Sequence, residues 1–204
     1  MKLLKQNSYE IVKLFINQLG ITIFALVLYT GLSFSANRET ALTITLWLSI
    51  FATLFYLVLL YFAGWEYGAK DKIKVDSGKY TAQPFKGAIL AIAANFINFL
   101  LAFVSIVFFV IHIAGGSAWF DTVARILNML MRFISSMYHG MVQSIISSLP
   151  SADPTTYLVE AICFAALPLL AVFATQLGYT LGMKNIKISS VFKGNGAKDN
   201  SSKD

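Results

Sequence analysis

Five amide side chains lie inside long apolar stretches of the sequence, where polar groups are costly and often functional. Two of them, Asn95 and Asn98, are three residues apart and would share one face of a helix. Because amides donate and accept hydrogen bonds, such a group could fasten helices together or bind a small polar ligand. We favour fastening, since no member is ionisable, and retain a ligand site as the alternative; the five residues are Asn17, Gln18, Asn95, Asn98 and Gln176.

One acid, Glu160, stands near the start of the last apolar stretch. This position predicts a carboxylate close to a membrane boundary, where it would be solvated rather than part of a proton relay. Arg125 or Arg132, in the segment before it, could pair with this carboxylate.

Sequence patterns of enzymes are weak. His112 and His139 have no metal-ligand or carboxylate partner pattern, and the stretch SGKYT at residues 77–81 lacks the first glycine of a phosphate-binding loop. Cys163, in an apolar stretch, would remain an unreactive thiol. We therefore predict a protein that is not an enzyme, with no cofactor and no metal site.

The composition indicates an integral membrane protein. Of the 204 residues, 57% are hydrophobic and 13% charged, and the mean hydropathy is +0.67, whereas soluble domains carry about 25% charged residues. Four stretches are long enough to cross a bilayer, which takes about 20 residues. We expect an all-α fold with transmembrane helices at 14–34, 41–63, 87–114 and 157–181, in one domain over residues 1–183.

The distribution of cations predicts the topology. All lysines fall in 1–13, in Trp65–Lys86 or in the tail 184–204, whereas the arginines fall on the other side of a four-span arrangement. The positive-inside rule then places both termini and the Trp65–Lys86 loop in the cytosol. The tail is polar and expected to be disordered.

The segment 117–149 repeats polar residues every three or four positions on an otherwise apolar background, as an amphipathic helix does. Crossing the membrane here would export the lysine-rich tail. We therefore predict a helix lying at the outer interface, with a re-entrant hairpin broken at Gly140 as the alternative.

Basic side chains at both membrane boundaries could contact anionic lipid headgroups. Acids are intermixed with the lysines of residues 65–86, which weakens this attraction and makes a solvated topology signal the simpler interpretation. The candidates for headgroup contact are Lys70, Lys72, Lys74, Arg125 and Arg132.

Two helix ends resemble each other: YGAKDKIKVDS at 67–77 and LGMKNIKISS at 181–190. A parallel internal repeat would produce this similarity. We favour the simpler cause, that both are helix exits needing a glycine and cytosolic lysines.

The stretch WEYGAKDKIKVDSGKYTAQPFKGAILAIAAN (65–95) and LGYTLG (177–182) resemble a pattern of uncharacterised bacterial four-span membrane proteins. The resemblance implies a multi-pass protein of the bacterial cytoplasmic membrane and carries no activity or site.

These features favour a non-enzymatic interaction or accessory subunit in the cytoplasmic membrane. Its partners would be the lipid bilayer and a membrane protein or a second copy, with no nucleic acid. The alternative is a small-molecule transport component with a polar cavity open to the cytosol; an immunity-like membrane protein is a weaker option. Transport would be favoured by coupled ionisable residues at mid-membrane, which the sequence does not show.

Overall fold

The computed structural model describes residues 5, 7–33, 38–78, 81–150 and 153–186, and the regular elements within them are helices. The predicted fold class is confirmed: four helices are long and apolar enough to cross a membrane. The elements are α2 (Ser8–Ser33), α3 (Arg38–Asp76), α4 (Lys86–Ala94), α5 (Phe96–Ile113), α6 (Ala118–Ile134), a 3₁₀ turn η1 (Ser136–Tyr138), α7 (His139–Ile146) and α8 (Pro154–Met183).

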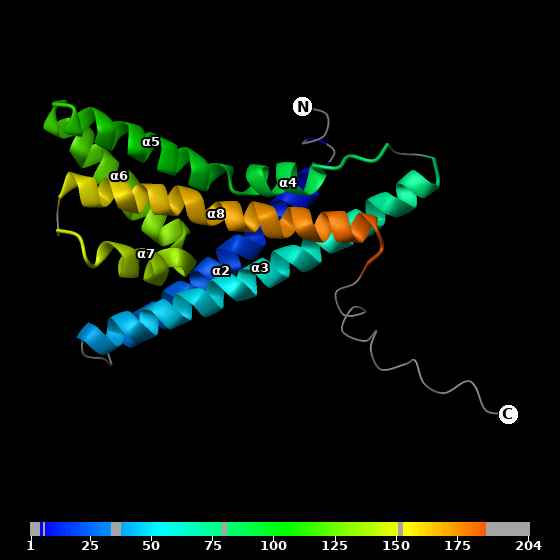
Figure 1. The fold of residues 1–204 in the computed structure, drawn as a ribbon, viewed down its shortest axis with the longest axis horizontal. Helices are drawn as coiled ribbons and strands as arrows, with labels where there is room; N and C mark the ends of the chain where they lie inside the picture. Colours follow the sequence, from blue (N-terminus) through cyan, green and yellow to red (C-terminus); the bar gives the residue numbers. More distant parts are fainter. Residues whose placement is uncertain (1–4, 6, 34–37, 79–80, 151–152, 187–204) are drawn as a thin grey trace.

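The helices form an elongated bundle with two distinct ends (Figure 1). At one end, α2 begins, α3 and α8 finish and α4 starts; we call this the lysine-rich end. At the other end, α5 passes into α6, and α7 leads towards the start of α8; we call this the hairpin end. Helices α3 and α8 run side by side in the same direction along the length of the bundle.

Helix α3 is longer than the predicted span 41–63 and continues to Asp76, so much of the expected loop is helical. This extension carries charged pairs one turn apart, such as Glu66 with Lys70 at 2.6 Å, which stabilise an exposed helix. The helix stops at Gly78, which has a φ of 71°, a left-handed conformation that suits glycine at a helix end. The glycine of SGKYT therefore terminates a helix.

The third predicted span, 87–114, consists of two helices rather than one. Asn95 separates α4 from α5 with φ −92° and ψ 10°, and its side-chain amide donates to the Ala91 carbonyl at 3.0 Å. A side chain that bonds the preceding turn competes with the regular helical pattern, which explains the interruption here.

The segment 117–149 is a helical hairpin and not the single helix predicted. Helix α6 enters the bundle from the hairpin end, η1 reverses the chain, and α7 returns (Figure 1). The reversal lies at residues 135–138, before Gly140, which instead allows α7 close to α3: a Cβ there would collide with the Thr45 carbonyl. The segment is therefore a helical hairpin, as in the re-entrant alternative, but its break lies at residues 135–138 rather than at Gly140.

The hairpin tip is buried in the bundle because neighbouring helices satisfy its irregular backbone. Thr22 on α2 donates to the Ile134 carbonyl at 2.9 Å, and Ser136 donates back to the Thr22 carbonyl at 2.9 Å. Ser49 on α3 donates to the Met137 carbonyl at 2.6 Å. Non-helical backbone is tolerated at membrane depth only with such partners.

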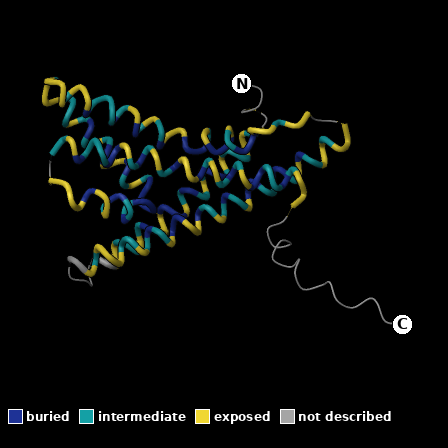
Figure 2. The backbone as a smooth tube through the Cα atoms, viewed as in Figure 1, coloured by how far each residue is buried: buried dark blue, intermediate teal, exposed yellow. Residues whose placement is uncertain are grey.

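Many exposed positions of the helices (Figure 2) carry apolar side chains. Large hydrophobic side chains are well exposed on all four spanning helices, including Phe24, Trp47, Phe103 and Phe173. Water would disfavour so large an apolar surface, whereas lipid tails accommodate it. The structure is thus compatible with a multi-pass membrane protein in contact with the bilayer.

Glycines on α3 and α8 let these two helices pack backbone to backbone. A Cβ at Gly64 or Gly68 would collide with α8 carbonyls, and one at Gly178 or Gly182 would collide with α3 carbonyls. Each helix therefore supplies a Gly-x-x-x-Gly pair to the same contact, the arrangement typical of close membrane helices. The similar exits of the two helices contain the second glycine of each pair, and the tail beyond residue 186 lies outside the described residues.

Candidate functional site

Three fully buried polar side chains converge on the middle of the bundle from different elements. Gln18 lies near the middle of α2, Tyr56 near the middle of α3 and Tyr138 at the hairpin tip, with 1%, 0% and 0% exposure. Among the described residues, neither amide atom of Gln18 nor the Tyr138 hydroxyl has a hydrogen-bond partner, whereas the Tyr56 hydroxyl faces the Asn95 side chain. Most buried polar groups in proteins are bonded, so this concentration requires an explanation.

The three side chains come from elements that pack together. Tyr56 and Tyr138 lie in the same buried core cluster. Gln18 lies one turn of α2, about 6 Å, from Thr22, which is bonded to the hairpin tip. Asn95, at the interruption between α4 and α5, lies beside the Tyr56 hydroxyl. We call Gln18, Tyr56, Asn95 and Tyr138 the central polar cluster.

The structure divides the five predicted amides between separate places. Asn95 and Asn98 lie together: both are buried, and Asn98 donates to the Asn95 side-chain oxygen at 3.2 Å. Gln18 is buried, whereas Asn17 is half-buried, as expected for neighbours about 100° apart around a helix. The bonds from Asn95 to Ala91 and from Asn98 to Asn95 are local, to residues three or four positions earlier, so fastening of separate helices by these two amides stays a prediction.

Gln176 binds the first turn of α4 instead of joining the asparagines. Its side-chain oxygen accepts from the Ala88 backbone N–H at 2.8 Å, and its nitrogen donates to the Pro84 carbonyl at 2.7 Å. It thereby satisfies an N–H that the start of a helix leaves without an internal partner. Ala88 and Asn95 are seven residues apart, which is about 10 Å along a helix.

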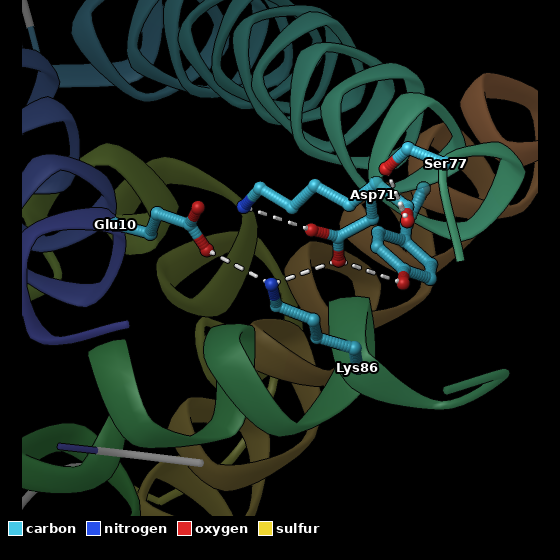
Figure 3. A network of polar contacts seen from close by, with 6 residues as sticks. Glu10, Asp71, Ser77 and Lys86 are labelled. Atoms are coloured by element: carbon cyan, nitrogen blue, oxygen red, sulfur yellow. Dashed lines mark hydrogen bonds and ion pairs between the residues drawn. The ribbon is translucent and has the colours of Figure 1, made fainter. Parts of the chain in front are cut away.

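A buried ion network closes the lysine-rich end (Figure 3). Lys86, at the start of α4, lies 2.8 Å from the Asp71 carboxylate on α3 and 3.6 Å from Glu10 on α2. Tyr179 on α8 donates to the same Asp71 carboxylate at 3.0 Å. Lys86 and Asp71 are each 2% exposed, so this network joins four helices through desolvated charges.

Lys74 and Ser77 complete the view of this network. Lys74 lies 3.6 Å from Asp71 on the exposed side, and Ser77 donates to the Lys74 carbonyl at 2.9 Å (Figure 3). A charged pair buried to this degree is stable only with further bonds to its remaining atoms, which Tyr179 and Glu10 supply.

A second ion network closes the hairpin end. Arg132 on α6 binds Glu160 on α8 through two bonds of 2.5 and 2.6 Å, and Asn128 donates to the same carboxylate at 3.0 Å. The predicted pairing of Glu160 with an arginine is thus confirmed for Arg132. The prediction that Glu160 is solvated is wrong, because it is 1% exposed; three donors from α6 replace its water.

The polar stripe of α6 faces α8, where its side chains bond to Glu160 and contact Tyr157. Asn128 is 1% exposed, and Arg125 stacks on Tyr157 with 4.3 Å between guanidinium carbon and ring centroid. The outward-facing groups are apolar, including Ile126, Met129 and Phe133. The stripe expected to meet water therefore joins two helices.

The two ion networks lie about one bilayer core apart. From Glu160 to Tyr179 is 19 residues of α8, or about 28 Å at 1.5 Å per residue, against ~30 Å for a hydrocarbon core. Residues 161–178 between them carry no charge. The central polar cluster lies between the networks, on the intervening parts of α2, α3 and the hairpin tip.

All five cations predicted to contact lipid headgroups have acidic partners within the chain. Lys70, Lys72 and Lys74 lie 2.6, 3.1 and 3.6 Å from Glu66, Asp76 and Asp71, and Arg125 lies 2.8 Å from Asp121. Arg132 binds Glu160. Headgroup contact stays a prediction, with each charge already partly neutralised.

His139 is one of the two histidines considered as catalytic residues, and it begins α7. The His139 ring contacts Tyr29 edge-on, with 5.9 Å between centroids. Among the described residues, no group of three or more histidines, cysteines or acids is placed to hold a metal ion.

Sequence reasoning missed Tyr56, Tyr138 and the buried pair Lys86–Asp71. The tyrosines lie in apolar stretches where aromatic residues are ordinary, and the charged pair lies in a stretch that predicted a solvated loop. Comparison with protein-family models, with curated proteins and with solved structures finds no match to this chain.

Proposed function

We propose that this protein is a non-enzymatic membrane transport component that binds a small polar molecule at the central polar cluster. The observation that carries this proposal is the set of buried, unpartnered polar atoms on Gln18 and Tyr138. Leaving such a group without a partner costs about 1–3 kcal/mol. Leucine or phenylalanine would fill these positions at lower cost, so a purely structural core does not explain them.

The backbone around the cluster supports the same proposal. The cluster is flanked by an interrupted helix at Asn95 and by the re-entrant tip at residues 135–138. Transporters commonly form substrate sites near mid-membrane from such discontinuous helices. Ion networks at both ends of the bundle would keep this site closed to each side.

The chemistry of the cluster indicates a neutral, hydrogen-bonding ligand. An amide and two phenolic hydroxyls donate and accept hydrogen bonds but carry no charge. An ionic ligand would instead need opposite charges near it. The ligand class that fits is a small uncharged molecule with several hydroxyl or amide groups.

We further propose that both termini face the cytosol and that the protein resides in a bacterial cytoplasmic membrane. The support is that the described lysines gather at the end of the bundle where α3 and α8 finish, as the positive-inside rule expects of a cytosolic side. The bacterial origin rests on the sequence resemblance.

The test is thermal unfolding of the purified protein with a panel of sugars, polyols, amides and nucleosides. A ligand at a hundred times its Kd adds about 2.7 kcal/mol to stability, so a member of the right class should raise Tm clearly. The control is the double variant Gln18→Leu, Tyr138→Phe, which should lose that shift. Equal shifts in both proteins, or none across the panel, would contradict the proposal.

A second candidate is an accessory subunit, favoured by the internal bonding of Asn95, Asn98 and Gln176. If these amides only stabilise the fold, apolar replacements should lower the activity of a partner complex in proportion to the loss of folded protein. Loss of activity with unchanged folded protein in Gln18→Leu would instead favour transport.

A further inference from the structure

Helix α4 is built differently from the other helices around the central polar cluster. It has nine residues and is separated from α5 by the interruption at Asn95. At its other end, residues 81–83 are non-helical. At the interruption itself, the Asn95 N–H still donates to the Ala91 carbonyl at 3.0 Å and its carbonyl accepts from Phe99 at 3.1 Å, so a single residue with a non-helical ψ joins α4 to α5.

Side chains at the lysine-rich end hold α4 in place. Lys86 is shared between Asp71 at 2.8 Å and Glu10 at 3.6 Å, and Gln176 binds the Pro84 carbonyl and the Ala88 N–H. Gly87 lets α4 lie directly on α8, where a Cβ would approach the Tyr179 Cβ to 2.7 Å. These contacts hold α4 in place through side chains of α2, α3 and α8.

The inner face of α4 is buried in the bundle and joins the central polar cluster through Asn95. Leu90, Ala91 and Ala94 are 0%, 1% and 5% exposed. Ala91 accepts the hydrogen bond from Asn95, which lies beside Tyr56. Displacing α4 would therefore move Asn95 and open the cluster on the side of Tyr56.

The hairpin end is held more firmly. Glu160 accepts three bonds of 2.5, 2.6 and 3.0 Å from Arg132 and Asn128. The hairpin tip adds bonds from Thr22, Ser49 and Ser136 between side chains and backbone. On the side of the lysine-rich end the closing element is the single nine-residue helix α4, whereas on the other side it is the whole hairpin of α6, η1 and α7.

We propose that α4 is the lid of the central polar cluster, hinged at Asn95 and latched by Lys86 to Asp71 and Glu10. The polar ligand then enters and leaves from the lysine-rich end. This inference rests on the proposed transport function and names the route to its site.

Cysteine accessibility tests the lid in the full-length protein, with Cys163→Ser as background. One reporter is Ala91→Cys on the inner face of α4, and the matched control is Ala102→Cys, equally buried on α5 beyond the hinge. N-ethylmaleimide should label both slowly. Adding Lys86→Met should accelerate labelling at position 91 about tenfold, equivalent to about 1.4 kcal/mol of lost lid contact, without change at position 102. Lys86→Arg should keep both rates slow.

Unchanged labelling at position 91, or equal acceleration at both positions in a folded protein, would overturn the lid. If Lys86→Met unfolds the chain, Gln176→Ala decides, because it releases Pro84 and Ala88 without stripping a buried charge; it must give the same selective acceleration. Selective acceleration with no stabilising solute in the panel would retain the lid and refute transport. A stabilising solute without selective acceleration at position 91 would retain the transport proposal and refute the lid.

Discussion

Buried polar side chains in this protein fall into two groups: some have hydrogen-bond partners and some do not. Asn98 gains a bond to Asn95 on burial, whereas Gln18 and Tyr138 are buried without partners. A buried amide or hydroxyl stabilises a fold only when it is paired. The same substitution, from polar to apolar, should therefore raise stability at some positions and lower it at others.

Replacing the unpartnered groups should stabilise the ligand-free protein. Tyr138→Phe and Gln18→Leu remove buried polar atoms without removing a hydrogen bond, so we expect each to raise stability by about 1 kcal/mol. Asn98→Leu is the control and should lower stability by about 0.6 kcal/mol, the average for a bond between membrane helices. Unfolding in detergent measures all three; a loss of stability in Tyr138→Phe would mean that its hydroxyl is bonded.

Buried and exposed ion pairs should differ sharply in this protein. Arg132→Met leaves the Glu160 carboxylate, which is 1% exposed, without the guanidinium that binds it through two bonds, and leaving a buried charge unpaired costs about 3–5 kcal/mol. Lys72→Met removes an exposed pair with Asp76, and such pairs contribute at most about 1 kcal/mol. Comparable losses of Tm in the two variants would contradict the burial of Glu160.

At the scale of elements, α3 and α8 form the backbone of the bundle because glycines bring them together. Four glycines face carbonyls of the opposite helix at distances that leave no room for a side chain. Dispersion contacts rather than the hydrophobic effect hold helices together in lipid, so this close approach is the main source of their affinity. The hairpin and α4 then pack against this pair.

Gly178→Ala should separate the two helices and destabilise the protein, since the new Cβ would meet the Tyr61 carbonyl. The matched control is Gly20→Ala on α2, which would meet nothing within 4 Å. A glycine within a helix costs about 0.5–1 kcal/mol relative to alanine, so this control should stabilise by that amount. Thermal unfolding of the two variants should give shifts of opposite sign; equal shifts would exclude tight α3–α8 packing.

At the scale of the whole molecule, the bundle has a polar centre and a charged network at each end. The separation of the two networks along α8, about 28 Å from 19 residues, matches one hydrocarbon core. This match positions the membrane on the bundle: α3 continues beyond it at the lysine-rich end, and the turns between α5, α6, α7 and α8 lie at the opposite boundary.

Cysteine labelling in whole cells should report the orientation of the bundle. In the Cys163→Ser background, an impermeant reagent outside the cell should modify Ser148→Cys and not Ser77→Cys. Both positions are exposed and lie at opposite ends of the bundle. Permeabilised cells provide the control, since both positions should then react. The reverse pattern in intact cells would place the lysines outside and refute the proposed topology.

The sequence by itself determined the all-α class, the four spans and the gathering of lysines at one end. These properties depend on apolar length and charge distribution, which are local along the chain. It also indicated the partner of Glu160, because Arg132 was among the few cations beyond the lysine-rich segments. The amphipathic period of 117–149 was visible, but its polar face turned towards α8 rather than water.

Tertiary structure alone decided the reversal at residues 135–138, the interruption at Asn95, and which polar groups meet. A re-entrant tip depends on Thr22 and Ser49, which lie more than 80 residues away in the chain and satisfy its backbone. Lys86 is buried only because Asp71, Glu10 and Tyr179 arrive from three other helices. Such partners are set by long-range packing, which periodicity and composition do not encode.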